Sequence, residues 1–151
     1  MKYLPHIVLL TIVSWISGCG TASAGGAASP EGGCQPGVMP RGHWVGEWQS
    51  FALAHPEAVR SGSIDLVIAD SGALNGSTAE SDNPDTGTLR GSVKASGEFK
   101  ADSVVMRGEF EHKYKLQGSV SCEGGALTGA GTTEWGGSDK GNLKFRLQRA
   151  E

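Results

Sequence analysis

Residues 88–94 (TLRGSVK) alternate strictly between two kinds of side chain. Leu89, Gly91 and Val93 fall on one side, and the residues between them are polar. Side chains two positions apart share a face of a β-strand, so this stretch is typical of a strand with one apolar face and one face in water. The same alternation recurs in residues 63–68, 116–122 and 142–148. Strands of this kind belong to antiparallel sheets that are covered on one side.

A short motif, Leu-x-Gly, links several of these segments. It places a leucine and a glycine on the same strand face, and it occurs four times: Leu74-Asn75-Gly76, Leu89-Arg90-Gly91, Leu116-Gln117-Gly118 and Leu127-Thr128-Gly129. Glycine-rich turn signals separate the segments at intervals of roughly 8 to 12 residues. The sequence therefore predicts an all-β domain, an antiparallel meander of about eight short strands between residues 42 and 148 that forms a small closed or partly closed barrel. One helical turn remains an alternative for residues 50–59.

The overall composition excludes some other classes of protein. The 151 residues include 24 glycines and 6 prolines, but no Gly-X-Y period, which excludes collagen. The formal net charge is −3, and acidic and basic residues are interspersed. Because binding to phosphate backbones needs a basic face, we expect no nucleic-acid partner.

The N-terminus carries a targeting signal. Residues 7–16 are an apolar run that is too short to span a bilayer, which takes about 20 residues, and that fits the core of a secretory signal peptide. The next residues complete the tetrapeptide Ile16-Ser17-Gly18-Cys19, which resembles the lipobox of bacterial lipoproteins. The resemblance implies that residues 1–18 are removed as a signal peptide and that Cys19 carries acyl chains. Two or more chains anchor a protein stably, so the expected partner of Cys19 is a membrane.

A second cleavage site competes with this one. Ala22-Ser23-Ala24 has the form of an ordinary signal-peptidase site, and cleavage after Ala24 would release a soluble secreted protein. If Cys19 is lipidated, the residue after it is Gly20 and not the aspartate that retains lipoproteins in the inner membrane, so the resemblance favours the outer membrane of a two-membrane cell. Residues 19–33 then form a Gly/Ala/Ser tether with a root-mean-square span of about 20 Å, and residues 34–151 form the β domain.

The cysteine count depends on that assignment. Once Cys19 is set aside, Cys34 and Cys122 remain, and an even pair in an oxidising compartment predicts a disulfide. Such a bridge would stabilise the fold by about 4 kcal/mol in the chain-entropy model. The alternatives are two free thiols or a catalytic thiol.

The first expected strand opens with Gly42-His43-Trp44. Gly-x-Trp at this place resembles the lipocalin and avidin superfamily of small meander barrels. The resemblance implies that a basic side chain late in the barrel stacks on the tryptophan and closes one end. Arg149 is the candidate partner for Trp44, with a cation–π gain of roughly 0.5–2 kcal/mol. The alternative is that Trp44 and Trp48 are core residues.

No catalytic constellation stands out in the sequence. No two of the histidines His43, His55 and His112 have the spacing of metal ligands, so we expect no enzyme activity, no metal and no cofactor. The sequence ranks an interaction or inhibitor module of the cell envelope first, which predicts a filled interior and an exposed apolar patch. One alternative is a binder of a small apolar ligand, with Trp44, Trp48 or Trp135 near the mouth of a cavity of about 300 Å³ or more. The other is a small hydrolase whose site the sequence does not reveal.

Overall fold

The computed structural model describes residues 34–137 and 139–151. The expected signal peptide, Cys19, the tether and the alternative cleavage site after Ala24 lie outside these residues. Within the described ranges no helix is long and apolar enough to cross a membrane.

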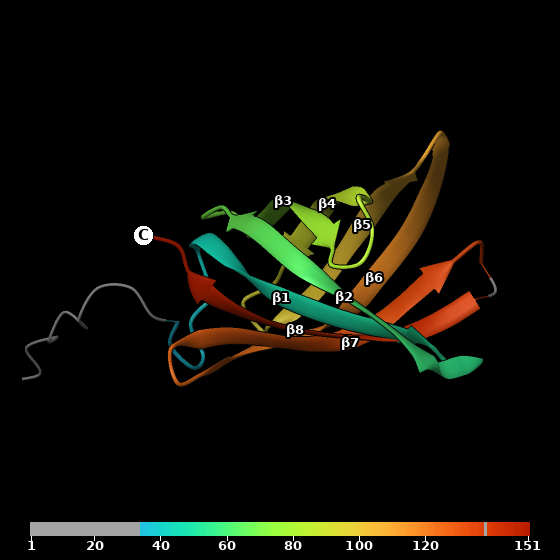
Figure 1. Ribbon diagram of the computed structural model, residues 1–151. Coiled ribbons are helices and arrows are strands. Elements are labelled where there is room, and N and C mark those ends of the chain that lie inside the picture. Colours follow the sequence, from blue (N-terminus) through green and yellow to red (C-terminus); the bar gives the residue numbers. More distant parts are fainter. Residues whose placement is uncertain (1–33, 138) are drawn as a thin grey trace, which may run out of the picture.

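The described chain forms eight antiparallel strands in sequence order, and β1 pairs with β8 to close a barrel (Figure 1). This confirms the predicted all-β meander and decides for a closed barrel. The strands are β1 (Gly42–Ala52), β2 (His55–Ile68), β3 (Ala73–Glu80), β4 (Thr86–Val93), β5 (Glu98–Arg107), β6 (Phe110–Glu123), β7 (Ala126–Trp135) and β8 (Asp139–Arg149).

The helical turn considered for residues 50–59 is wrong. Ser50 pairs with Arg60 and Phe51 with Val59 across the β1–β2 hairpin, and a register shift follows Phe51. Pairing with β2 and β8 satisfies the backbone of β1 without a helix, and this tertiary pairing overrides the alanines and leucine of the stretch.

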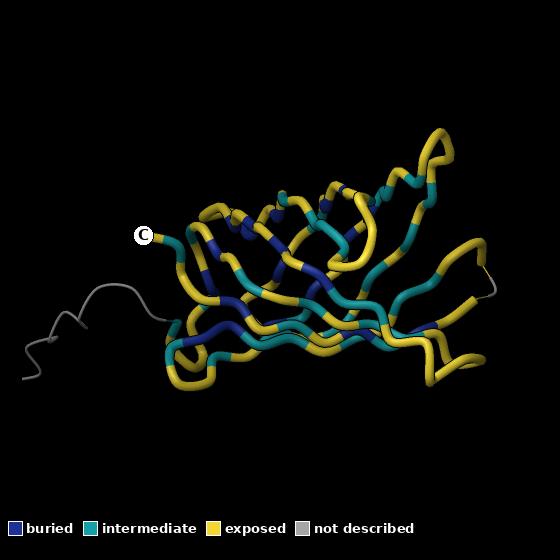
Figure 2. The backbone as a smooth tube through the Cα atoms, in the orientation of Figure 1, coloured by how far each residue is buried: buried dark blue, intermediate teal, exposed yellow. Residues whose placement is uncertain are grey.

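The two ends of the barrel differ. The turns β2–β3, β4–β5 and β6–β7 share one end with the beginning of the described chain and the C-terminus, and the other hairpins point the opposite way (Figure 1). We call the first the closed end and the second the open end. The largest fully buried side chains are Trp44, Ile68, Leu127 and Leu147, all of them near strand ends at the closed end. The hairpin tips at the right of Figure 2 are mostly exposed.

A disulfide joins Cys34 to Cys122, with the two Cα atoms 5.4 Å apart. The Cys34 amide also donates a hydrogen bond to the carbonyl of Gly125 in the β6–β7 turn, at 3.1 Å. From there residues 34–41 lead to β1, and the Arg41 carbonyl accepts a hydrogen bond from the Trp44 indole at 3.2 Å. The predicted bridge therefore fastens the start of the domain to the closed end.

Inward-facing glycines let large side chains lie flat on the barrel wall. A Cβ on Gly129 would overlap the ring of Phe145, its partner on β8, and a Cβ on Gly62 would lie 2.9 Å from the Trp48 indole nitrogen. Both aromatic rings therefore occupy space that a side chain on the neighbouring strand would take. Gly129 of the Leu-x-Gly motif thus makes room for an aromatic ring, whereas a Cβ on Gly76, Gly91 or Gly118 would first meet the backbone of the neighbouring strand.

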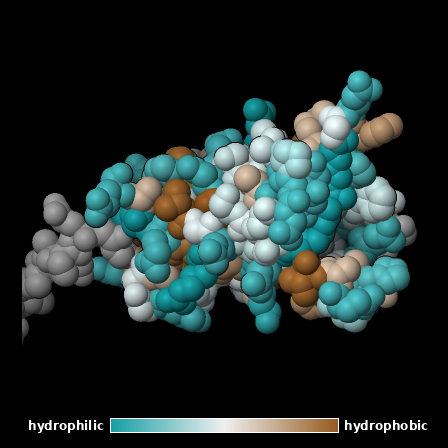
Figure 3. Space-filling model, in the orientation of Figure 1, coloured by the Kyte–Doolittle hydropathy of each residue, from teal (hydrophilic) through white to brown (hydrophobic). Residues whose placement is uncertain are grey.

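Charges alternate around the outer wall. One row of directly paired residues on β4 to β8 reads positive, negative, positive, negative, positive: Arg90, Asp102, Lys115, Glu134 and Lys140. Opposite charges at facing positions favour a pairing by roughly 0.2–1 kcal/mol each, and a slip of one strand by one residue would remove these pairs. This row therefore helps to specify the register. The face shown in Figure 3 is largely hydrophilic, with isolated apolar patches.

Candidate functional site

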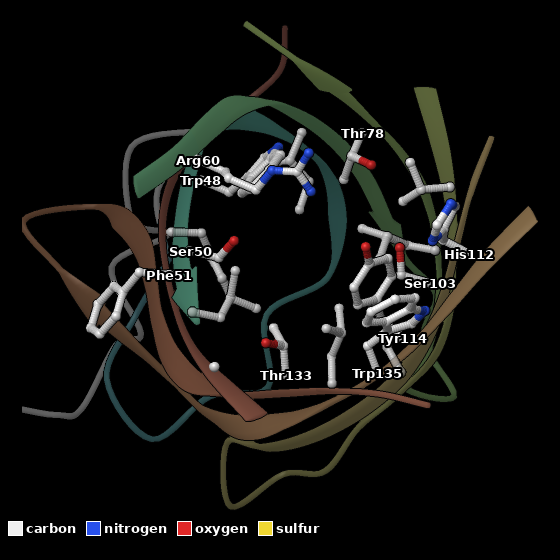
Figure 4. A pocket seen from close by; sticks show the side chains of 18 of the residues that line it. Trp48, Ser50, Phe51, Arg60, Thr78, Ser103, His112, Tyr114, Thr133 and Trp135 are labelled. Carbon is white, nitrogen blue, oxygen red and sulfur yellow. The ribbon is translucent and has the colours of Figure 1, made fainter. Parts of the chain in front are cut away.

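The barrel encloses a cavity of about 700 Å³. It reaches from the β1–β2 and β7–β8 tips of the open end into the apolar core, and Figure 4 looks into it. Its deeper wall is apolar and comes from seven strands: Ile64, Leu66, Ile68, Leu74, Leu89, Val93, Phe99, Ala101, Leu116, Val120, Leu127, Leu143 and Phe145. A lining of this kind favours an apolar occupant, because each Å² of apolar surface removed from water contributes roughly 25 cal/mol.

Two of the three candidate tryptophans line this cavity. Trp48 on β1 projects from one side and Trp135, at the end of β7, from another (Figure 4). Trp48 is held in place by a hydrogen bond from its indole nitrogen to the Ser63 carbonyl, at 3.1 Å. Trp135 is 42% exposed and packs against His112, with ring centroids 5.5 Å apart.

Trp44, in contrast, does not lie at the mouth, and its assignment to the ligand site needs correction. It is 1% exposed and belongs to the core at the closed end, and the residues that line the cavity do not include it. Its position follows from the register, since Trp44 pairs with Leu66 and with Arg149 near the ends of β2 and β8.

The suggested Trp44–Arg149 pair occupies facing positions on β1 and β8. The Arg149 guanidinium lies beside Gly42, where a Cβ would approach its Nη2 atom to 3.2 Å, and the residue as a whole is exposed. The two residues are thus neighbours at the closed end. The stacked geometry remains a prediction from the resemblance.

Hydroxyl groups line the cavity on the open-end side of its apolar part. They come from five strands: Ser50, Thr78, Ser103, Tyr114 and Thr133 (Figure 4). Burial raises the pKa of the Tyr114 phenol, and the carboxylates of Glu80 and Asp85 act in the same direction against the lowering effect of Arg60. Tyr114 therefore stays neutral and can donate a hydrogen bond into the cavity.

Two ion pairs lie on the cavity wall near the open end. Arg60 Nε is 2.8 Å from Glu80 Oε1, and Arg107 Nε is 3.3 Å from Asp85 Oδ2. Both carboxylates are largely buried, with 8% and 15% of their side chains exposed. The two acids come together because the Glu80 amide donates a hydrogen bond to the Asp85 carbonyl, at 3.1 Å, across the β3–β4 connection.

The polar lining residues and several aromatic ones were missed from the sequence, although one signal was available. Extending the alternation of β6 backwards from Leu116 places Tyr114 and His112 on the inner face. Extending β3 forwards from Leu74 does the same for Thr78 and Glu80. Phe99 and Phe145 also line the cavity, as an edge-to-face pair with ring centroids 5.7 Å apart.

Among the described residues there is no cluster of three or more histidine, cysteine or carboxylate side chains that could hold a metal ion. Comparisons of the chain with protein-family models, with curated proteins and with solved structures give no significant match. The site is therefore interpreted from its own geometry.

Proposed function

We propose that this protein binds a small, largely apolar molecule inside its barrel, and that it does so while anchored to a membrane through acyl chains on Cys19. The observation that carries the proposal is the cavity of about 700 Å³ with a deep apolar wall and a polar opening. Cavities for small ligands range from about 300 to 1,000 Å³ and combine an apolar lining with a few polar groups.

The cavity favours this function over the envelope interaction or inhibitor module that the sequence ranked first. That module was expected to have a filled interior. A hollow core is costly unless it serves a purpose, because side chains facing an empty space lose packing contacts. A ligand of matching volume would restore those contacts.

The resemblance to lipocalins and avidins also supports a ligand-binding function. It is supported by the closed meander of eight strands and by Gly42-His43-Trp44 at the start of β1. Barrels of this size hold one small ligand when their interior is not filled by side chains.

The anchoring part of the proposal rests on the lipobox-like residues 16–19. The described chain begins with Cys34 at the closed end, so a tether to Cys19 would leave the barrel on the side away from the opening. In this arrangement the tether attaches at the end opposite the opening and does not block it. Replacing Cys19 with serine should abolish membrane partitioning and remove the acyl mass, whereas a soluble protein beginning at Gly25 would support cleavage after Ala24.

The binding part is tested by titrating the protein with N-phenyl-1-naphthylamine, a neutral apolar fluorophore whose emission rises in dry surroundings. We expect saturable binding with one probe per chain. The variant Val105→Trp fills the cavity wall from β5, and it should weaken binding at least about tenfold, equivalent to 1.4 kcal/mol.

The matched control is Val104→Trp, which adds the same side chain one position along β5, outside the set of residues that line the cavity. It should leave binding unchanged. Absence of saturable binding by the unmodified protein, or equal weakening by both variants, would contradict the proposal.

A further inference from the structure

The polar groups at the opening of the cavity indicate which class of ligand it binds. Arg60 and Arg107 carry two positive charges, and Glu80 and Asp85 carry two negative charges. The four side chains come from neighbouring segments of the wall, and all four line the same cavity. The opening is therefore strongly polar but has no net charge from these groups.

Arg107 offers donors to a ligand beyond its ion pair. Its Nε atom is buried beside Asp85, at 3.3 Å, and makes no hydrogen bond to the described residues. The side chain as a whole is 28% exposed, so the remaining N–H groups of the guanidinium can donate to a ligand oxygen.

Tyr114 adds a second donor. It lies on β6, next to β5, and lines the same cavity as the two ion pairs. Figure 4 shows Arg60, Thr78 and Tyr114 projecting into the same opening. These groups can both donate hydrogen bonds to a ligand and accept them.

The equal numbers of positive and negative side chains at the opening determine which polar head group of a ligand fits there. A carboxylate or phosphate placed here would approach Glu80 and Asp85, and an ammonium group would approach two guanidinium groups. Either charged head would also lose its water shell, which is costly unless a free counter-charge is available. A neutral head with hydroxyl or carbonyl oxygens avoids both penalties.

We infer that the ligand is a neutral amphiphile, with a hydrocarbon body in the apolar part of the cavity and an uncharged head, with hydroxyl or carbonyl oxygens, beside the two ion pairs. The inference rests on the proposed function. The Tyr114 hydroxyl and the exposed part of the Arg107 guanidinium donate to the oxygens of the head.

The first experiment uses the unmodified protein and three ligands with twelve-carbon chains, all below their micellar concentrations. Each competes with bound N-phenyl-1-naphthylamine: monododecanoyl glycerol with a neutral head, dodecanoate with a negative head and dodecylammonium with a positive head. We expect the neutral ligand to displace the probe at a concentration at least about tenfold lower than either charged one. Equal or better displacement by a charged ligand would overturn the inference.

Three variants then locate the head group. Tyr114→Phe and Arg107→Met should each weaken binding of the neutral ligand about fivefold to tenfold more than they weaken binding of the probe. Glu80→Gln leaves an excess positive charge and should increase the affinity for dodecanoate at least about fivefold. Lys113→Met, an exposed change on β6 outside the cavity, is the control and should alter none of these values.

The outcomes separate the two proposals. If the unmodified protein fails to bind the probe, the proposed function is wrong and this inference falls with it. If the probe binds but the three head groups compete equally, or if Tyr114→Phe and Arg107→Met have no selective effect, the cavity binds apolar molecules and only the assignment of the head group is wrong.

Discussion

Glycines with a positive φ occur in turns at both ends of the barrel, but their surroundings differ. Gly72 and Gly97 at the closed end have φ of 83° and 86°, and their carbonyls accept hydrogen bonds from Val93 and Val120, both at 2.8 Å. At the open end, a Cβ on Gly108 or Gly136 would meet no described atom within 4 Å. The β2–β3 and β4–β5 turns are thus hydrogen-bonded to β4 and β6, whereas the β5–β6 and β7–β8 tips project away from the barrel.

The side chains at the two ends of the barrel also differ in burial and in chemistry. Trp44 at the closed end is 1% exposed, and Trp135 at the open end is 42% exposed. The disulfide lies at the closed end, and the two buried carboxylates lie toward the open end. The difference indicates that one end of this barrel supplies the stability and the other supplies the chemistry of binding, so each end should respond to its own set of mutations.

The largest expected effect compares the two tryptophans. Trp44→Ala should lower the free energy of unfolding by about 3–5 kcal/mol, because it leaves a cavity in a fully buried core. Trp135→Ala should lower it by less than about 1 kcal/mol, since the side chain is already partly in water. Urea denaturation of both variants measures the difference, and similar losses would refute the division of the molecule into two ends.

Removal of the disulfide should have the next largest effect. Cys34→Ser with Cys122→Ser frees a loop of 88 residues and should cost about 2–4 kcal/mol of unfolding free energy. Because the bridge lies away from the opening, the folded variant should bind the fluorescent probe within about twofold of the unmodified protein. Denaturation and titration of one preparation give both values, and a large loss of affinity would show that the two ends are coupled.

A smaller effect is expected where a glycine makes room for an aromatic ring. Gly129→Ala should destabilise the barrel by about 1–3 kcal/mol, because the new methyl group overlaps the Phe145 ring. Phe145→Leu in the same chain should relieve part of that cost. A double-mutant cycle measures the coupling, and strictly additive losses would show that the ring can move away without penalty.

The smallest effect is expected for the ion pair between Arg60 and Glu80. Replacing both, with Arg60→Met and Glu80→Leu, should change the unfolding free energy by less than about 1 kcal/mol, since the cost of burying the charges offsets their attraction. The same double variant should change the relative affinities for dodecanoate, dodecylammonium and monododecanoyl glycerol. A loss of several kcal/mol of unfolding free energy would show instead that the pair stabilises the fold.

The fold was accessible from the sequence because its signals are local. The alternation in residues 88–94 and in the Leu-x-Gly repeats shows directly which side chains face inwards, and the spacing of turns counts the strands. The pairing of Cys34 with Cys122 followed from the cysteine count, and it is present.

The site was accessible only in part, because it depends on which end of each strand reaches the open end. Trp44 and Trp48 share a strand face, yet one lies in the core and the other lines the cavity. The Arg60–Glu80 pair depends on the register of two strands, and the cavity depends on how side chains on facing strands fill the interior. Neither property is contained in the pattern of one segment.

The central claim, that a ligand occupies the interior of the barrel, is tested most directly by methyl NMR of the protein titrated with monododecanoyl glycerol. We predict saturable shifts of the methyl groups of Leu89, Leu116 and Leu143, which line the cavity, and no shifts for Val45 and Val67 on the outer face. Shifts confined to the outer face, or no shifts at saturating ligand, would contradict the account.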